Sequence, residues 1–115
     1  MEFTTEDVRA FIINQRTELV NHCRFLQSRY GWTGSEQDAA VDWARRYATD
    51  YRDIGSRLLS LLWTHPRRCE LFSAGMAEIA RHKYFRSELL GYDLGLKVAG
   101  EEWLLAHFPT WVATV

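Results

Sequence analysis

Apolar residues follow a helical period through the first part of the chain. They recur three or four positions apart, which places them on one face of a helix; the residues are Val8, Phe11, Ile12, Leu19, Cys23, Leu26 and Tyr30. Thr4 with Asp7 three positions later is typical of a capping box at a helix start. Gly31 is the residue type that most often follows a helix end. The pattern therefore predicts a helix over residues 5–30.

A second apolar stripe of constant phase follows another capping-box pair, Ser35 and Asp38. It predicts one helix from residue 36 to about residue 63. Gly55 is a weak point in that helix, because glycine has a poor helix propensity. The alternative is a break at Asp53–Gly55, followed by a separate short helix.

The tripeptide Thr64-His65-Pro66 separates this helix from the next. The residue before a proline disfavours helix, whereas proline itself fits the first helical turn. We therefore predict a third helix from Pro66 to Gly91 and a fourth over residues 94–108, stopped by Pro109. No segment alternates with a period of two. The prediction is an all-α fold with short connections, an antiparallel four-helix bundle or two stacked helical hairpins.

The fourth predicted helix has almost no polar face. Its apolar residues are Leu94, Leu96, Val98, Ala99, Trp103, Leu104, Leu105, Ala106 and Phe108. A helix that is apolar nearly all round must be buried on two sides. In one small bundle, one of those sides normally faces solvent. We therefore expect something outside the single chain to shield this helix.

A shift of 60 positions aligns residues 8–52 with residues 68–112. Six identical pairs result, where composition alone gives roughly three. The pairs are Glu18/Glu78, His22/His82, Phe25/Phe85, Gly31/Gly91, Ala39/Ala99 and Trp43/Trp103. Such self-similarity indicates a duplicated helical hairpin. The alternative is that two amphipathic hairpins of similar length share glycine caps and core aromatics for ordinary reasons.

Composition limits the classes of function. The 115 residues are 47% hydrophobic, which suits a single domain over residues 1–115 without a disulfide or metal to hold it. Fourteen Lys and Arg against fifteen Asp and Glu give a net charge of −1, so no overall field attracts nucleic acid or an anionic membrane. Weak nucleic-acid binding through local arginines is therefore only the third hypothesis for function.

The chain is expected to be cytoplasmic and not membrane-bound. Its N-terminus has no basic and apolar leader, and its longest dense apolar run, residues 58–63, is far below the roughly 20 residues of a bilayer span. Cys23 and Cys69 are expected to be reduced thiols that pack as small core residues. Cys69 is the better candidate for a reactive thiol, because it follows Arg67 and Arg68.

Two Glu–His pairs are the best candidates for chemistry. Glu18 precedes His22 by four positions, and Glu78 precedes His82 by four, so each pair shares a helix face. Two such pairs across a bundle would suit a divalent transition metal. Di-iron bundles use a spacing of three, so the pattern already departs from theirs. The alternative is a pair of exposed ion pairs whose imidazoles rest on the edge of the core.

Asp42 and Glu102 would complete a set of four carboxylates and two histidines. Helical phase places Asp42 opposite the apolar stripe, on the solvent face, so we exclude it from that set. No nucleophile motif and no phosphate-binding loop is present. The sequence therefore favours a protein that is not an enzyme and needs no cofactor.

The surplus of large apolar residues gives the leading hypothesis. Exposed aromatic patches mark protein–protein contacts. We predict an assembly module that forms a homodimer, or binds another protein, through its C-terminal apolar region. The predicted interface is Trp32, Tyr92, Trp103, Leu104, Phe108 and Trp111. The alternative is that the tail over residues 108–112 folds back over its own core.

Overall fold

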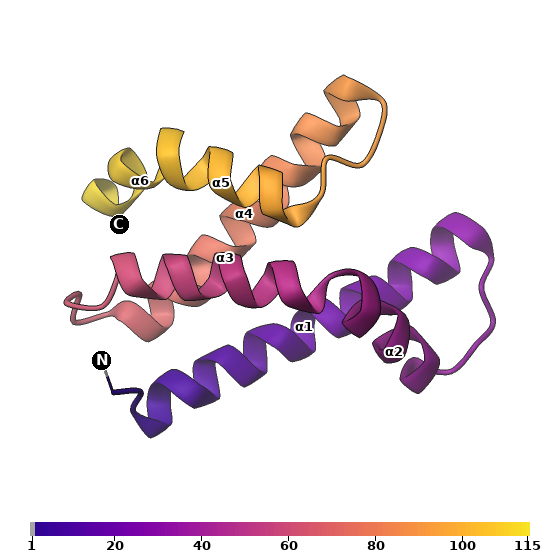
Figure 1. Cartoon of the computed structure of the whole chain (residues 1–115), viewed down its shortest axis with the longest axis horizontal. Coiled ribbons are helices and arrows are strands. Elements are labelled where there is room, and N and C mark those ends of the chain that lie inside the picture. The colour runs from indigo at the N-terminus through magenta and orange to yellow at the C-terminus, as the bar shows by residue number, and fades with distance from the viewer. Residues whose placement is uncertain (1) are drawn as a thin grey trace. The chain divides into compact units, whose positions relative to one another are not determined.

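The computed structural model describes residues 2–115, which form helices and connecting turns without a strand (Figure 1). The helices are α1 (Thr5–Tyr30), α2 (Glu36–Arg46), α3 (Ala48–Leu61), α4 (Arg68–Leu90), α5 (Leu96–Ala106) and α6 (Phe108–Thr114). The all-α prediction is confirmed. The four-helix bundle is not confirmed, because six helices are present in this range.

The chain divides into two compact units. The first is Met1–Thr49 and the second is Asp50–Val115, so the boundary lies in the first turn of α3. The first unit contains the hairpin of α1 and α2. The second contains most of α3 together with α4, α5 and α6. Among residues 2–115, no helix combines the length and apolar character that a membrane crossing requires.

The predicted helix ends of the first unit are confirmed. Asp7 donates its backbone N–H to the Thr4 hydroxyl at 3.1 Å, and the Asp7 carboxylate accepts the Thr4 N–H at 2.9 Å. Ser35 and Asp38 make the same reciprocal pair at the start of α2. Gly31 follows α1 with φ of 61°, in the left-handed region that glycine enters without strain.

The predicted second helix is wrong in one respect, since it is two helices. α2 ends at Arg46, and Tyr47 has φ of −125° and ψ of −19° before α3 begins. Gly55 lies buried inside α3, so the alternative break at that glycine is wrong as well. The break at Tyr47 involves no proline or glycine, and the apolar residues on either side of it keep the same helical phase. The sequence pattern therefore did not indicate the break.

The C-terminal prediction also needs correction. α5 ends at Ala106, and α6 resumes at Phe108 with Pro109 in its first turn. Proline lacks an N–H, but the first turn has no intrahelical partner for that group. Pro109 therefore lies in the first turn of the short helix α6, and the chain remains helical beyond it. The third prediction is close, because α4 begins at Arg68 and ends where Gly91 follows with φ of 77°.

Two glycines allow the helices of the second unit to approach closely. A Cβ on Gly75 of α4 would lie 2.8 Å from a methyl carbon of Leu58, and one on Gly100 of α5 would lie 2.7 Å from Ile54. Both partners belong to α3, which therefore packs against α4 and α5. The buried core of this unit includes Ile54, Leu58, Leu71, Phe72, Met76, Ile79, Ala99 and Trp103.

Candidate functional site

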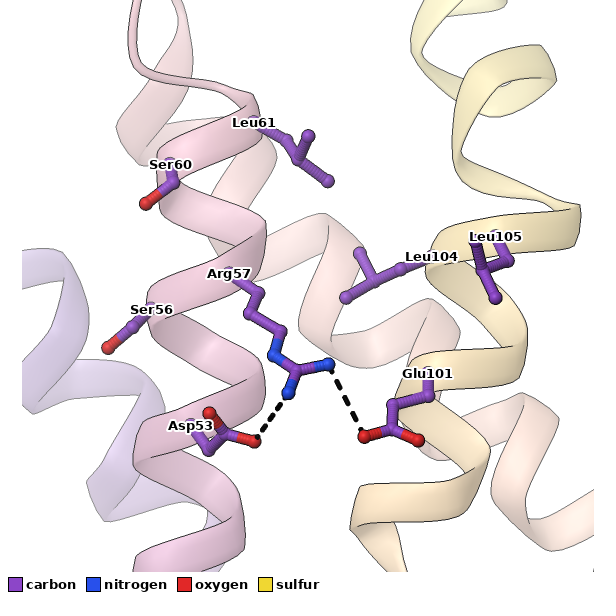
Figure 2. Close-up of a pocket in the computed structure, with 8 residues that line it drawn as sticks. All are labelled: Asp53, Ser56, Arg57, Ser60, Leu61, Glu101, Leu104 and Leu105. Atoms are coloured by element: carbon purple, nitrogen blue, oxygen red, sulfur yellow. Dashed lines mark hydrogen bonds and ion pairs between the residues drawn. The ribbon is translucent and has the colours of Figure 1, made fainter.

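A hollow of about 780 Å³ lies between α3 and α5 in the second unit. Leu61 enters it from α3 and Leu104 from α5, and the two side chains point toward each other (Figure 2). Leu105 lies beside Leu104 at the rim. Leu105 is 84% exposed and Leu61 is 55% exposed, so together they leave apolar surface open around the hollow. We refer to this feature, lined by Leu61, Leu104 and Leu105, as the leucine groove.

Charged side chains close one end of the leucine groove. Arg57 of α3 lies between two carboxylates, 3.4 Å from Asp53 and 3.3 Å from Glu101 of α5 (Figure 2). All three side chains are substantially exposed. Solvent-exposed ion pairs contribute little to stability. Their relevance is that this end of the groove carries both signs of charge.

The opposite flank of α5 is buried. Ala99, Gly100 and Trp103 form that flank, and they lie in the core of the second unit. Val98 and Leu105 face outward although they are equally apolar. One flank of the helix is therefore buried, while apolar side chains also remain on its exposed flank. We expected α5 to be buried on two sides. Within the single chain only the side with Ala99, Gly100 and Trp103 is buried.

The predicted interface residues are divided by the structure. Trp103 is 4% exposed and Phe108 is 8% exposed, so these two are core residues and the prediction that they face a partner is corrected. The reason is α6, which folds back and brings the Trp111 ring to 5.3 Å and the Phe108 ring to 6.1 Å from Trp103. The alternative for the tail is thus the arrangement observed.

The other predicted interface residues lie elsewhere. Leu104 is half-buried and lines the leucine groove. Tyr92 is exposed in the loop between α4 and α5. Trp32 is half-buried in the loop between α1 and α2, with its ring closely packed on Gly34. Within the second unit, Tyr92 is not among the residues that line the leucine groove.

A buried imidazole links the two helices of the first unit. His22 Nε2 lies 2.7 Å from Asp42 Oδ2, and the Tyr47 ring meets the His22 ring edge to face at 5.3 Å. Arg46 Nε pairs with the other carboxylate oxygen of Asp42, Oδ1, at 2.9 Å. Our placement of Asp42 on the solvent face is wrong. That placement treated α2 and α3 as one straight helix, whereas the break after Arg46 gives α2 a face of its own.

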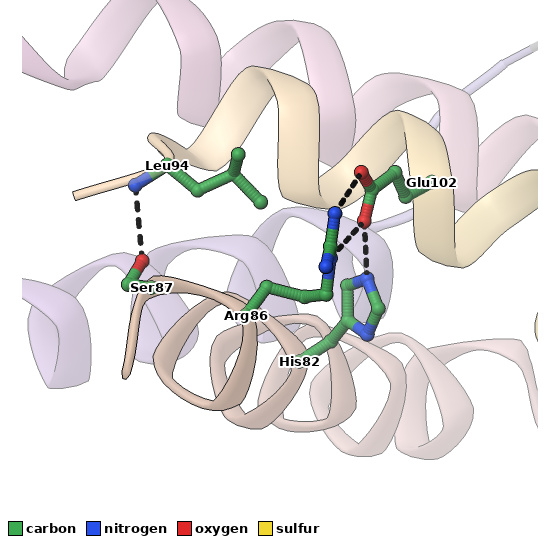
Figure 3. Close-up of polar contacts among 5 residues, drawn as sticks. All are labelled: His82, Arg86, Ser87, Leu94 and Glu102. Carbon is green, nitrogen blue, oxygen red and sulfur yellow. Dashed lines mark hydrogen bonds and ion pairs between the residues drawn. The ribbon is translucent and has the colours of Figure 1, made fainter. Parts of the chain in front are cut away.

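The second unit contains a similar arrangement (Figure 3). His82 Nε2 lies 2.9 Å from Glu102 Oε1, and Arg86 donates to the same carboxylate through Nε at 3.1 Å. Hydrogen bonds from Arg86, and then from His82, hold the pKa of Glu102 below its ordinary value. The His107 ring lies against His82 at 5.3 Å. The adjacent Ser87 hydroxyl accepts the Leu94 N–H, which fixes the loop that follows α4.

The metal hypothesis gains no support from this geometry. The carboxylate of Glu78 pairs with Arg81, and His82 pairs with Glu102. Within residues 2–115, no group of three or more His, Cys, Asp and Glu side chains could hold an ion. His22 and Glu18 belong to the first unit, whereas His82 and Glu78 belong to the second. Metal binding by these four residues stays a prediction.

The other sequence candidates have structural roles or ordinary surroundings. His65 Nδ1 accepts the Arg67 N–H just before α4, as expected of a residue that helps to begin a helix. Cys69 is half-buried and Cys23 is buried, and both are free thiols. The guanidinium groups that precede Cys69 have other partners, since Arg67 pairs with Glu70 and Arg68 lies over the Trp63 ring.

The two hairpins share several features at a separation of 60 residues. α2 and α5 begin and end 60 positions apart, and the residues that follow them, Tyr47 and His107, each donate an N–H to a tryptophan carbonyl at 2.8 Å. In both hairpins the histidine meets a carboxylate 20 positions later. Sequence comparison missed Tyr47 and His107 because the two rings differ in type. Only their place in the alignment could have indicated them.

Comparison with protein-family models, curated proteins and solved structures finds no match to this chain.

Proposed function

We propose that this protein is a non-enzymatic helical assembly module that forms a homodimer through the leucine groove. The observation that carries the proposal is Leu105, whose side chain is 84% exposed beside an apolar hollow. Covering an exposed leucine is worth about 1.5–3 kcal/mol, and a symmetric dimer covers two.

A second copy fits this surface better than an unrelated partner. One face of the second unit carries both a protruding side chain, Leu105, and a recess between Leu61 and Leu104 (Figure 2). An interface about a two-fold axis requires such self-complementarity, because each copy presents the same patch. The charged end carries Arg57 as well as Asp53 and Glu101, so pairing two copies can bring opposite charges together.

Replacement of Leu105 tests the proposal directly. We expect the wild-type protein to sediment as a dimer in the micromolar range and Leu105→Glu to be a monomer, since a buried carboxylate without a partner is costly. Leu89→Glu is the matched control, because Leu89 is also exposed but lies on α4 outside the groove. Sedimentation equilibrium distinguishes the outcomes. A wild-type monomer at roughly 100 μM, or equal dissociation of both variants, would contradict the proposal.

We also propose that the two hairpins are copies of one unit, and that the module is cytoplasmic. Support for the duplication comes from the six identical pairs and from the matching helix ends and histidine–carboxylate contacts. The two free thiols support the proposed location, because reduced cysteines are typical of cytosolic proteins.

Nucleic-acid binding is less well supported than assembly. Five arginines that could have formed a basic patch face carboxylates instead. They are Arg46, Arg57, Arg67, Arg81 and Arg86.

A further inference from the structure

One face of α1 is aliphatic, cationic and open to solvent. Ile12 and Ile13 are 54% and 56% exposed, and Val8 and Val20 are exposed on the same helix. Arg9 lies three and four positions before the isoleucines, and Arg16 lies four and three positions after them. Side chains at these spacings are neighbours on a helix surface. We name Val8, Arg9, Ile12, Ile13, Arg16 and Val20 the α1 face.

The arginines of the α1 face are free to pair with a ligand. No carboxylate within residues 2–115 makes an ion pair with Arg9 or Arg16. The sequence has no acidic residue between Asp7 and Glu18. Most arginines of the second unit, by contrast, already face carboxylates. The α1 face is therefore a local positive surface on a chain whose net charge is close to zero.

Corresponding positions in the second unit are covered. The residues 60 positions after Ile12 and Arg16 are Phe72 and Met76, and each is 1% exposed. At these two positions α4 is buried, whereas the matching positions of the α1 face are exposed. Arg16 of α1 takes the position that the buried Met76 has in α4. A helix that covered α1 in the same way would need a carboxylate at that point.

We propose that the α1 face binds an amphipathic helix of another protein, with an aliphatic stripe flanked by acidic residues. Arg9 and Arg16 are seven residues apart, about 10 Å along the helix, and two carboxylates at the same spacing on a partner helix can reach both. Isoleucines between them supply the apolar contact. This is helix-on-helix recognition with charge selecting the partner.

The charges argue against two other occupants. A second copy packed antiparallel on the α1 face would bring Arg9 opposite Arg16, so like charges would meet. A membrane surface would favour a wide apolar face with basic residues at its edges. Here Arg16 lies between Ile12 and Val20, within the aliphatic stripe. The partner helix is the occupant that satisfies both the aliphatic and the cationic side chains.

A designed peptide pair provides the test. The probe is a fluorescein-labelled helical peptide of about 18 residues, with leucine at every third or fourth position and glutamates flanking the stripe; its counterpart has lysines in place of the glutamates. Fluorescence anisotropy with the full chain measures binding. We expect the acidic peptide to bind and the lysine peptide not to bind.

Charge reversal on the protein makes the test specific. We expect Arg9→Glu/Arg16→Glu to weaken binding of the acidic peptide at least roughly tenfold and to create binding of the lysine peptide. Arg24→Glu/Arg29→Glu is the matched control, since both arginines are exposed on α1 outside the face, and it should bind the acidic peptide as the wild type does. The gain of lysine-peptide binding cannot arise from misfolding.

Three results would overturn the proposal. The first is equal binding of both peptides, and the second is acidic-peptide binding that the reversal does not change. The third is wild-type protein that binds phosphatidylserine vesicles but neither peptide. Leu105→Glu should bind the acidic peptide normally, because the leucine groove and the α1 face share no residue. Failure of the dimer proposal would thus leave this one standing.

Discussion

Glu102 shows how a single carboxylate can organise a hairpin. Its oxygens accept hydrogen bonds from Arg86 and His82, both on α4, although Glu102 itself lies on α5 (Figure 3). Because the charged form is the one that accepts these bonds, the pKa of Glu102 is lowered. Asp42 has the same position in the first hairpin, where it contacts His22 and Arg46. At the residue scale, each hairpin is joined by charge-assisted contacts beside its core.

The lowered pKa of Glu102 predicts a pH dependence of stability. A carboxyl whose pKa is lower in the folded state stabilises the fold above its ordinary pKa of 4.5, and this contribution is lost as the pH falls through the folded value. We therefore expect Glu102→Gln to be less stable than the wild type near pH 7 and the difference to shrink near pH 3.

Urea denaturation at the two pH values measures this difference. Glu88→Gln is the control, because Glu88 is an exposed glutamate on α4 that makes no ion pair within residues 2–115 and should change stability little at either pH. A difference between wild type and Glu102→Gln that is the same at both pH values would contradict the role of ionised Glu102.

At the scale of elements, close helix approach decides the packing of the second unit. α3 contacts α5 where Gly100 has no side chain, and the Ile54 side chain fills that space. Alanine would improve the helix propensity of α5 by about 1 kcal/mol. Its Cβ would, however, lie 2.7 Å from two carbons of Ile54, which is too close for van der Waals contact. The cost of this steric clash should exceed the gain in helix propensity, because the surrounding core keeps both helices from moving apart.

We expect Gly100→Ala to destabilise the protein by up to about 2 kcal/mol, because overpacking costs about 1–3 kcal/mol and the gain in helix propensity offsets about 1 kcal/mol of that. In an Ile54→Ala background the Cβ has room, so the same substitution should become neutral or stabilising. Urea denaturation of the four proteins in this cycle gives the coupling between the two sites. Additive effects, or a stabilising Gly100→Ala in the wild-type background, would show that the helices can separate at this point.

Local signals account for most of the helix ends. The capping boxes at Thr4 and Ser35 and the glycines at 31 and 91 were predictable, because each acts through backbone groups within a few residues. The break after Arg46 and the restart at Phe108 were not. A bend that keeps the apolar stripe continuous leaves no mark on the hydrophobic period, and Pro109 is compatible with either an end or a start.

At the scale of the whole molecule, the main feature is the correspondence between the hairpins. The bounds of α2 and α5, the glycines that follow α1 and α4, and the histidine–carboxylate contacts recur after 60 positions in two separate compact units. The surroundings differ, because α3 packs against the second hairpin at Ile54 and Leu58. A duplicated unit would thus have diverged in what covers it, with the α1 face left open.

Double-mutant cycles test whether the His22–Asp42 and His82–Glu102 contacts stabilise their hairpins in the same way. We expect His22→Gln and Asp42→Asn to couple by about 1 kcal/mol in the free energy of unfolding, the net worth of an ordinary hydrogen bond. His82→Gln and Glu102→Gln should couple with the same sign. Coupling in one hairpin and none in the other would argue against copies of one unit. Urea denaturation provides the values, and circular dichroism checks that each variant is helical.

Sequence alone determined the helical class, the caps and the ends marked by glycine, because these depend on groups close together in the chain. It also indicated that residues 94–108 carry more apolar side chains than a helix with one buried face needs. Only the tertiary structure decided which flank of α5 is buried, that Trp103 and Phe108 belong to the core, and that His22 reaches Asp42. These outcomes depend on bends and on contacts between residues distant in sequence, which a helical period does not encode.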